Sequence, residues 1–144
     1  MKITFTGRND KITCAEYSRM ARFMLPLLMK SHETRDIQIN ISFERDDPMN
    51  RGMKGHTMDQ EDGEYEIWIR PTMSAKEQRL TFAHELVHVK QYVRKELCPF
   101  SGKVLSKSLQ SLDTEHSGDY YDNPSEIEAN GRAVGLVARY IQQR

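Results

Sequence analysis

The sequence predicts an α+β domain in which helices pack on a small, mostly antiparallel sheet. Two stretches, residues 37–43 and 64–70, alternate apolar and polar side chains as half-buried strands do. Three other stretches begin with helix-capping residues and continue with apolar residues at helical spacing. A chain of 144 residues suits one domain with a sizeable core, so we expect a single domain spanning residues 1–144.

The N-terminal part is expected to form a strand, a helix and a second strand. KITFT, residues 2–6, alternates apolar and polar side chains like a short strand. Thr13 and Glu16 have capping-box spacing and open the first helix, which Pro26 should kink or shorten. Residues 37–43, IQINISF, then place four apolar side chains on one face, the clearest strand pattern in the chain.

The middle of the chain is expected to be a charged loop followed by a hairpin strand. Residues 45–63 carry charges, glycines and a proline, and they leave open a short strand around MKGHTM, residues 53–58. Asp62 and Gly63 favour a tight turn just before the alternating stretch EYEIWIR, residues 64–70.

Two further helices are expected in the C-terminal half. Ser74 and Glu77 form a capping box that opens a helix over about residues 74–97. Residues 99–123 are polar and form a connection of unusual length. Asn123, followed by a proline at the first helical position, then starts a last helix that runs to the C-terminus.

Composition narrows the classes of function and the compartment. Lysine plus arginine equals aspartate plus glutamate at 21 each, and this zero net charge gives no support to general nucleic-acid binding. Cys14 and Cys98 are far apart and form no disulfide framework, which suits a reducing cytoplasm. The apolar run at residues 20–29 is too short to span a bilayer, so we expect a cytoplasmic protein without a membrane partner.

The stretch HELVH, within the helix expected at residues 74–97, carries the chemistry. His84 and His88 are four residues apart and project from one face, so each can give one imidazole nitrogen to a single ion. Glu85 is rotated by about 100° from His84 and can take a proton from a metal-bound water. This is the HExxH arrangement of two zinc ligands and a general base.

The surroundings of the two histidines strengthen this interpretation. They lie between two apolar strips of the helix, and two buried imidazoles need polar partners, which one shared metal ion would supply. The alternative is a chance match, with ordinary buried histidines. The two strips consist of Phe82, Leu86, Val89 and Val93 on one side and Leu80, Ala83 and Val87 on the other.

A third ligand must come from elsewhere in the chain, because Gln91 and Arg94 stand where an extended HExxHxxGxxH motif needs glycine and histidine. Glu128 is the favoured candidate. It precedes a stripe of small residues that would let the last helix approach the HELVH helix closely. Glu126, which fits a purely capping role, and His116 are the alternatives. The stripe consists of Gly131, Gly135 and Ala138.

HELVH followed by a later helix containing PSEIEAN resembles the minimal gluzincin metallopeptidases. More loosely it resembles ImmA/IrrE-type proteins and small phage and bacterial metallopeptidase-like proteins. The resemblance covers roughly half of the chain, from the strand near Tyr65 to the end. It implies a minimal zincin-like fold and one Zn²⁺ per chain, held by His84, His88 and Glu128. SprT-like proteases share HExxH but use a third histidine, a role open to His116.

The expected activity is zinc-dependent hydrolysis of peptide bonds in a peptide or protein substrate, with Glu85 as general base. Tyr120, Tyr121 and His116 precede the last helix and are candidates to stabilise the oxyanion, although the tyrosines could equally pack at the helix entrance. Gln91 either supports His88 or makes a structural hydrogen bond.

As in zincins generally, an edge strand is expected to pair with extended substrate, and EYEIWIR is the candidate, with Trp68 facing either substrate or core. Two other functions stay open. One is a non-catalytic or regulatory zinc-binding protein that recognises a protein partner. The other is a SprT-like protease acting near nucleic acid. Zero net charge and the lack of a zinc-ribbon cysteine set argue against the latter.

Overall fold

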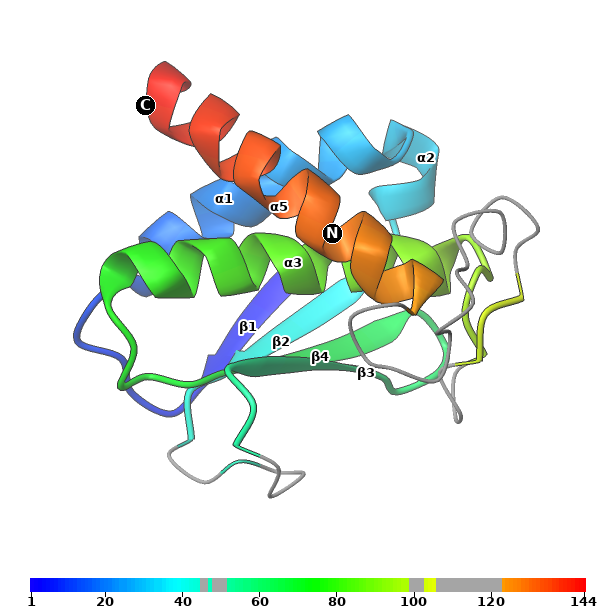
Figure 1. Cartoon of the computed structure of the whole chain (residues 1–144). Coiled ribbons are helices and arrows are strands. Elements are labelled where there is room, and N and C mark those ends of the chain that lie inside the picture. Colours follow the sequence, from blue (N-terminus) through cyan, green and yellow to red (C-terminus); the bar gives the residue numbers. More distant parts are fainter. Residues whose placement is uncertain (45–46, 48–51, 99–102, 106–122) are drawn as a thin grey trace.

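Four strands form one mixed sheet, and the helices lie on one face of it (Figure 1). The computed structural model describes residues 1–44, 47, 52–98, 103–105 and 123–144. The α+β class expected from the sequence is confirmed. Within the described residues the elements are β1 (Lys2–Thr6), α1 (Cys14–Leu28), α2 (Ser31–Thr34), β2 (Gln38–Ser42), β3 (Gly55–Asp59), β4 (Glu64–Ile69), α3 (Ala75–Val93) and α5 (Pro124–Gln143).

The strand order is β1-β2-β4-β3, and the expectation of a mostly antiparallel sheet is wrong. β1 pairs with β2 and β2 with β4 in parallel, and β3 alone pairs antiparallel, with β4. The helices α1 and α2 between β1 and β2 return the chain to the same end of the sheet, which makes the pairing parallel. β4 is therefore a central strand, and the edge strand next to it is β3.

The hairpin between β3 and β4 confirms the short strand that the sequence left open around MKGHTM. Glu61, Asp62 and Gly63 all have positive φ, at 70°, 54° and 78°, so three consecutive residues adopt the left-handed region. The amide of Glu64 donates to the carbonyl of Glu61 at 3.0 Å and closes the turn. The turn expected at Asp62 and Gly63 is thus present, and it places β3 at the open edge of the sheet.

Helix α1 begins where the sequence predicted, because the Thr13 side chain accepts a hydrogen bond from the amide of Glu16 at 3.1 Å. Pro26 lies inside the helix, which ends two residues later at Leu28. The short helix α2 was not expected.

Trp68 on β4 is 1% exposed and donates through Nε1 to the carbonyl of Glu44, so of the two orientations expected for it, toward substrate or core, it packs in the core.

Helix α3 lies along the sheet and forms the centre of the core (Figure 1). Ser74 caps it as expected, by accepting from the amide of Glu77 at 3.2 Å. The helix ends at Val93 rather than near residue 97, because Lys95 adopts a positive φ of 57°. Its apolar side is buried against the sheet and α1; the buried residues are Phe82, Ala83, Leu86, Val87 and Val89.

Helix α5 crosses α3 on the side away from the sheet (Figure 1). Asn123 caps it by accepting from the amide of Ser125 at 3.0 Å, as predicted. The small residues expected to face α3 do not do so, since Gly131 and Gly135 are exposed with nothing near the position of a Cβ atom. The buried face consists instead of Ala129, Ala133, Leu136, Val137 and Tyr140.

No helix among the described residues combines the length and the apolar character needed to cross a membrane. The connection expected at residues 99–123 lies almost wholly outside the described residues.

Candidate metal centre

Helices α3 and α5 bring two histidines and one glutamate together. His84 and His88, one turn apart on α3, have their Nε2 atoms 3.1 Å from each other. Glu126, in the first turn of α5, places Oε2 2.9 Å from His84 Nε2 and Oε1 3.0 Å from His88 Nε2. One ligand atom from each of these residues lies within 4.8 Å of the others, so the three could hold a metal ion. We call this set the histidine cluster.

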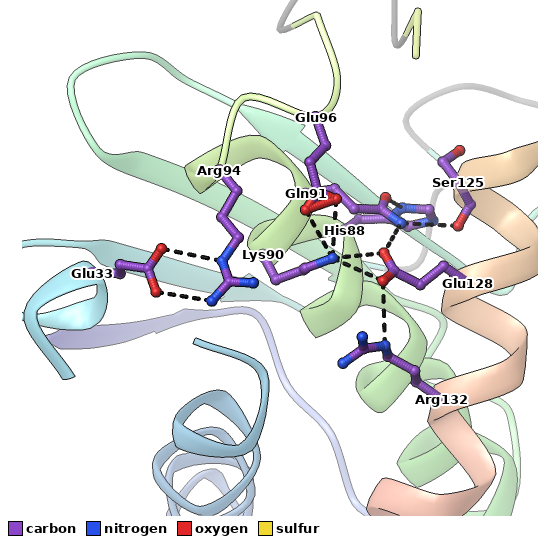
Figure 2. Close-up of polar contacts among 9 residues, drawn as sticks. All are labelled: Glu33, His88, Lys90, Gln91, Arg94, Glu96, Ser125, Glu128 and Arg132. Carbon is purple, nitrogen blue, oxygen red and sulfur yellow. Dashed lines mark hydrogen bonds and ion pairs between the residues drawn. The ribbon is translucent and has the colours of Figure 1, made fainter. Parts of the chain in front are cut away.

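The preference for Glu128 as third ligand is corrected by this arrangement, and the alternative Glu126 takes its place. Both oxygens of Glu128 are bound by Lys90, at 2.9 and 2.8 Å. Gln91 and Arg132 also contact this carboxylate, at 2.9 and 3.3 Å (Figure 2). Glu128 therefore lies in a separate ionic cluster.

Other candidates from the sequence cannot be placed. His116, Tyr120 and Tyr121 lie outside the described residues, so the structure assigns no position to the alternative ligand or to the candidate oxyanion donors.

The face that α5 turns toward α3 explains why Glu126 and not Glu128 meets the histidines. Glu126, Ala129, Ala133, Leu136 and Tyr140 follow each other at steps of three and four, so they share one face of the helix. This face is the buried one. Glu126 lies three residues before Ala129, the first apolar residue of this repeat. The apolar repeat of α5 was thus the signal in the sequence that identifies Glu126.

Each histidine is oriented by a hydrogen bond from its other ring nitrogen. His84 Nδ1 lies 2.9 Å from Asn130 Oδ1, and His88 Nδ1 lies 2.7 Å from Gln91 Oε1. Both partners are acceptor oxygens, so Nδ1 donates and Nε2 is the nitrogen that faces the cluster, where it has a free lone pair whenever the ring is neutral. Of these orienting residues, the sequence had indicated Gln91 but not Asn130.

Glu126 Oε2 is the buried side-chain oxygen without a hydrogen-bond partner in the described part of the chain. It lies close to His84 Nε2, and in a neutral ring whose Nδ1 donates to Asn130 this nitrogen is also an acceptor. Facing lone pairs in a buried site are unfavourable unless a cation lies between them. Two imidazole nitrogens and a carboxylate oxygen therefore fit a transition-metal ion.

Protons and a metal ion would compete for this cluster. Burial alone lowers the pKa of His88, but the hydrogen bond with Glu126 and the charges of Glu85 and Glu126 raise that pKa to about 9. Burial raises the pKa of Glu126, whereas the imidazoles of His84 and His88 that face its carboxylate have the larger combined effect and lower that pKa. The site thus favours positive charge at its centre, whether a proton or a metal ion supplies it.

Glu85 is buried beside the cluster and is held by the edge strand. Thr57 on β3 donates through Oγ1 to Glu85 Oε2 at 2.5 Å and also lies 3.2 Å from the Glu85 carbonyl. A Cβ atom at Gly55 would lie 2.6 Å from Thr81 Cγ2, so a glycine is required for β3 to approach α3 this closely. Glu85 is 5% exposed and is not one of the three cluster residues.

A cleft of about 680 Å³ opens next to His84 and Glu85. One of its walls is the start of β3 and the residues before it, and the opposite wall is the side of α5 that carries Asn130. Most of its side chains apart from the two site residues are apolar. The lining includes Met53, Leu80, Thr81, Ala133 and Val134.

Comparisons of the chain with protein-family models, with curated proteins and with solved structures found no match.

Proposed function

We propose that the chain is a zinc-dependent metallopeptidase whose Zn²⁺ is held by His84, His88 and Glu126. The observation that carries this proposal is the convergence of two imidazole nitrogens and one carboxylate within 4.8 Å, with Glu85 buried beside them. Three protein ligands of this kind, with a fourth position left for water, are typical of catalytic rather than structural zinc sites. A bound zinc ion supplies Lewis-acid chemistry and lowers the pKa of its water.

Glu85 acts as the general base in this proposal. It takes a proton from the attacking water and returns that proton to the leaving amine nitrogen, so no net proton is consumed. The Thr57 hydroxyl binds Oε2 and keeps the side chain in place, which leaves the other carboxylate oxygen for proton transfer. A purely structural metal site has no need of such a group.

The substrate is an extended peptide. In the described residues, β3 pairs with β4 on one side only, so its other edge can accept a peptide through backbone hydrogen bonds. The cleft beside Glu85 would take one side chain of that peptide, and its walls favour an apolar one. This assigns to β3 the role that the sequence had indicated for β4.

A non-catalytic zinc-binding protein is the second candidate, and one observation favours it. The three ligands join α3 and α5, so a metal ion would also stabilise the packing of these helices. Cys14 and Cys98 form no disulfide bond within the described part of the chain, which for either function is in keeping with a reducing, cytoplasmic compartment.

The test is a comparison of the wild-type chain with Glu85→Gln. Metal content is measured by elemental analysis, and hydrolysis is followed on a fluorescently labelled unstructured protein such as casein. We expect about one zinc per chain in both proteins, because Glu85 is not a ligand. Hydrolysis should fall by roughly 10²–10⁴-fold in Glu85→Gln, the usual contribution of general acid–base catalysis.

Two results would contradict the proposal. A wild-type chain that binds no zinc even after zinc is added would remove the metal centre. A chain that binds zinc but shows no hydrolysis above background, with Glu85 or with the glutamine in its place, would support the non-catalytic alternative.

A further inference from the structure

A buried lysine, Lys90, lies on α3 two residues after His88 of the histidine cluster. Lys90 on α3 is 3% exposed, and its ammonium group donates to Glu128 Oε1 and Oε2 at 2.9 and 2.8 Å and to Glu96 Oε2 at 3.0 Å (Figure 2). A buried ammonium is costly unless every proton finds a partner, and here two carboxylates supply the partners. They come from different parts of the chain, because Glu96 follows α3 and Glu128 belongs to α5.

The contacts of Glu128 lead from Lys90 to His88. Gln91 Nε2 donates to Glu128 Oε1 at 2.9 Å and to the carbonyl of Ser125 at 3.0 Å. Because the nitrogen of this amide is committed to two acceptors, its oxygen is the atom that faces His88 Nδ1 at 2.7 Å. The orientation of Gln91, and with it the tautomer of His88, therefore depends on Glu128.

The same contacts fasten the first turn of α5 to α3. Ser125 and Glu128 lie on either side of the ligand Glu126 in the sequence, and both are bound by residues of α3. Lys90 also binds both oxygens of Glu128, so this carboxylate is fixed to α3 on the side of Lys90.

We propose that Lys90 is a positioning residue of the metal centre. It acts through Glu128 on two ligands at once, by orienting Gln91 against His88 and by fixing the turn that carries Glu126. This inference rests on the metal site of the proposed function but is independent of peptide hydrolysis.

The experiment measures the dissociation constant for Zn²⁺ by competition with a chromophoric chelator, at a temperature where circular dichroism shows each protein to be folded. We expect Lys90→Met to bind zinc roughly 10–100-fold more weakly, the cost of removing an outer partner of a metal ligand. Lys90→Arg, which keeps the charge, should recover much of the affinity. At saturating Co²⁺ the Lys90→Met absorption spectrum should match wild type, because the ligands are unchanged.

The matched control is Arg79→Met. Arg79 lies on the same helix, and its Nε contacts Glu16 Oε1 at 3.1 Å in a largely buried ion pair away from the metal centre. We expect this variant to bind zinc like the wild type. If Lys90→Met does not fold, Glu128→Gln tests the same path, because an amide cannot accept from Lys90 with both of its side-chain atoms.

Each contrary outcome has a distinct meaning. Wild-type affinity in folded Lys90→Met or Glu128→Gln would overturn the inference, as would an equal loss of affinity in Arg79→Met. A changed Co²⁺ spectrum in Lys90→Met would overturn it too, because the ligand set itself would then have changed. A wild-type chain without affinity for zinc would instead remove the proposed function.

Discussion

Glu126 and Glu128 are two residues apart on α5, yet their carboxylates have different partners. Glu126 faces two imidazole nitrogens, and one of its oxygens has no hydrogen-bond partner among the described residues. Glu128 faces the ammonium of Lys90 and the guanidinium of Arg132, and both of its oxygens are bound. The partners of a carboxylate, and not its place in a motif, therefore decide whether it is available to a metal ion.

The pKa values of the two groups follow the same division. Burial raises the pKa of Glu128, but the hydrogen bonds from Lys90 and Gln91 act against burial and lower it. The Glu128 carboxylate is therefore neutralised by fixed protein charges. Glu126 faces two imidazoles, which bind a metal ion in their neutral form, so the charge of its carboxylate stays available to that ion.

Removing the metal ion should have the largest effect. Because the ligands join α3 and α5, zinc at a thousand times its dissociation constant should stabilise the folded chain by about 4.1 kcal/mol. Thermal unfolding with zinc and with excess chelator measures this difference. An unchanged Tm would mean that the histidine cluster does not bind the ion in the folded state.

Replacing the two glutamates separately tests the comparison directly. Glu126→Ala removes a ligand, so zinc affinity should fall by more than the roughly 100-fold that marks the upper end for outer partners. The zinc affinity of Glu128→Ala should fall by roughly 10–100-fold, and this variant should keep the wild-type Co²⁺ spectrum. A larger loss in Glu128→Ala than in Glu126→Ala would reverse the assignment.

Thr57→Val tests the group that holds Glu85 and leaves both glutamates of α5 in place. The substitution preserves shape but removes a hydrogen bond to a carboxylate, an interaction that contributes about 1.5–3 kcal/mol. We expect kcat on the casein substrate to fall roughly 10-fold or more, with zinc content unchanged. Thr57→Ser should retain most of the activity, and equal kcat in all three proteins would exclude a role for the hydroxyl.

The smallest expected effect comes from the exposed side of α5. Gly131 has no atom near the position of a Cβ, so Gly131→Ala should stabilise the chain by roughly 0.5–1 kcal/mol without changing zinc affinity. Ala133, 5% exposed on the buried side, is the matched position, and Ala133→Leu should destabilise by roughly 1–3 kcal/mol through overpacking. Urea unfolding measures both. A destabilising Gly131→Ala would mean that the glycine face contacts another part of the chain.

Features that depend on neighbours in the sequence could be predicted from the sequence. His84, Glu85 and His88 were identified because a helix places residues four apart on one side, whatever the helix packs against. The caps at Thr13, Ser74 and Asn123 are local hydrogen bonds and were predicted for the same reason. The alternating strands were also found, but alternation says nothing about which strands become neighbours, so the parallel pairings and the edge position of β3 were missed.

The third residue of the histidine cluster was decided by tertiary structure. Glu126 and Glu128 are about 200° apart around the helix axis, so the rotation of α5 about its axis decides which of them meets the two histidines. Burial of Ala129, Ala133 and Leu136 determines that face, and the free energy of burying it outweighs any local preference at the helix start. The role of Lys90 depends even more on tertiary structure, because a lysine in a helix of mixed composition shows its role only when both carboxylates that neutralise it are in place.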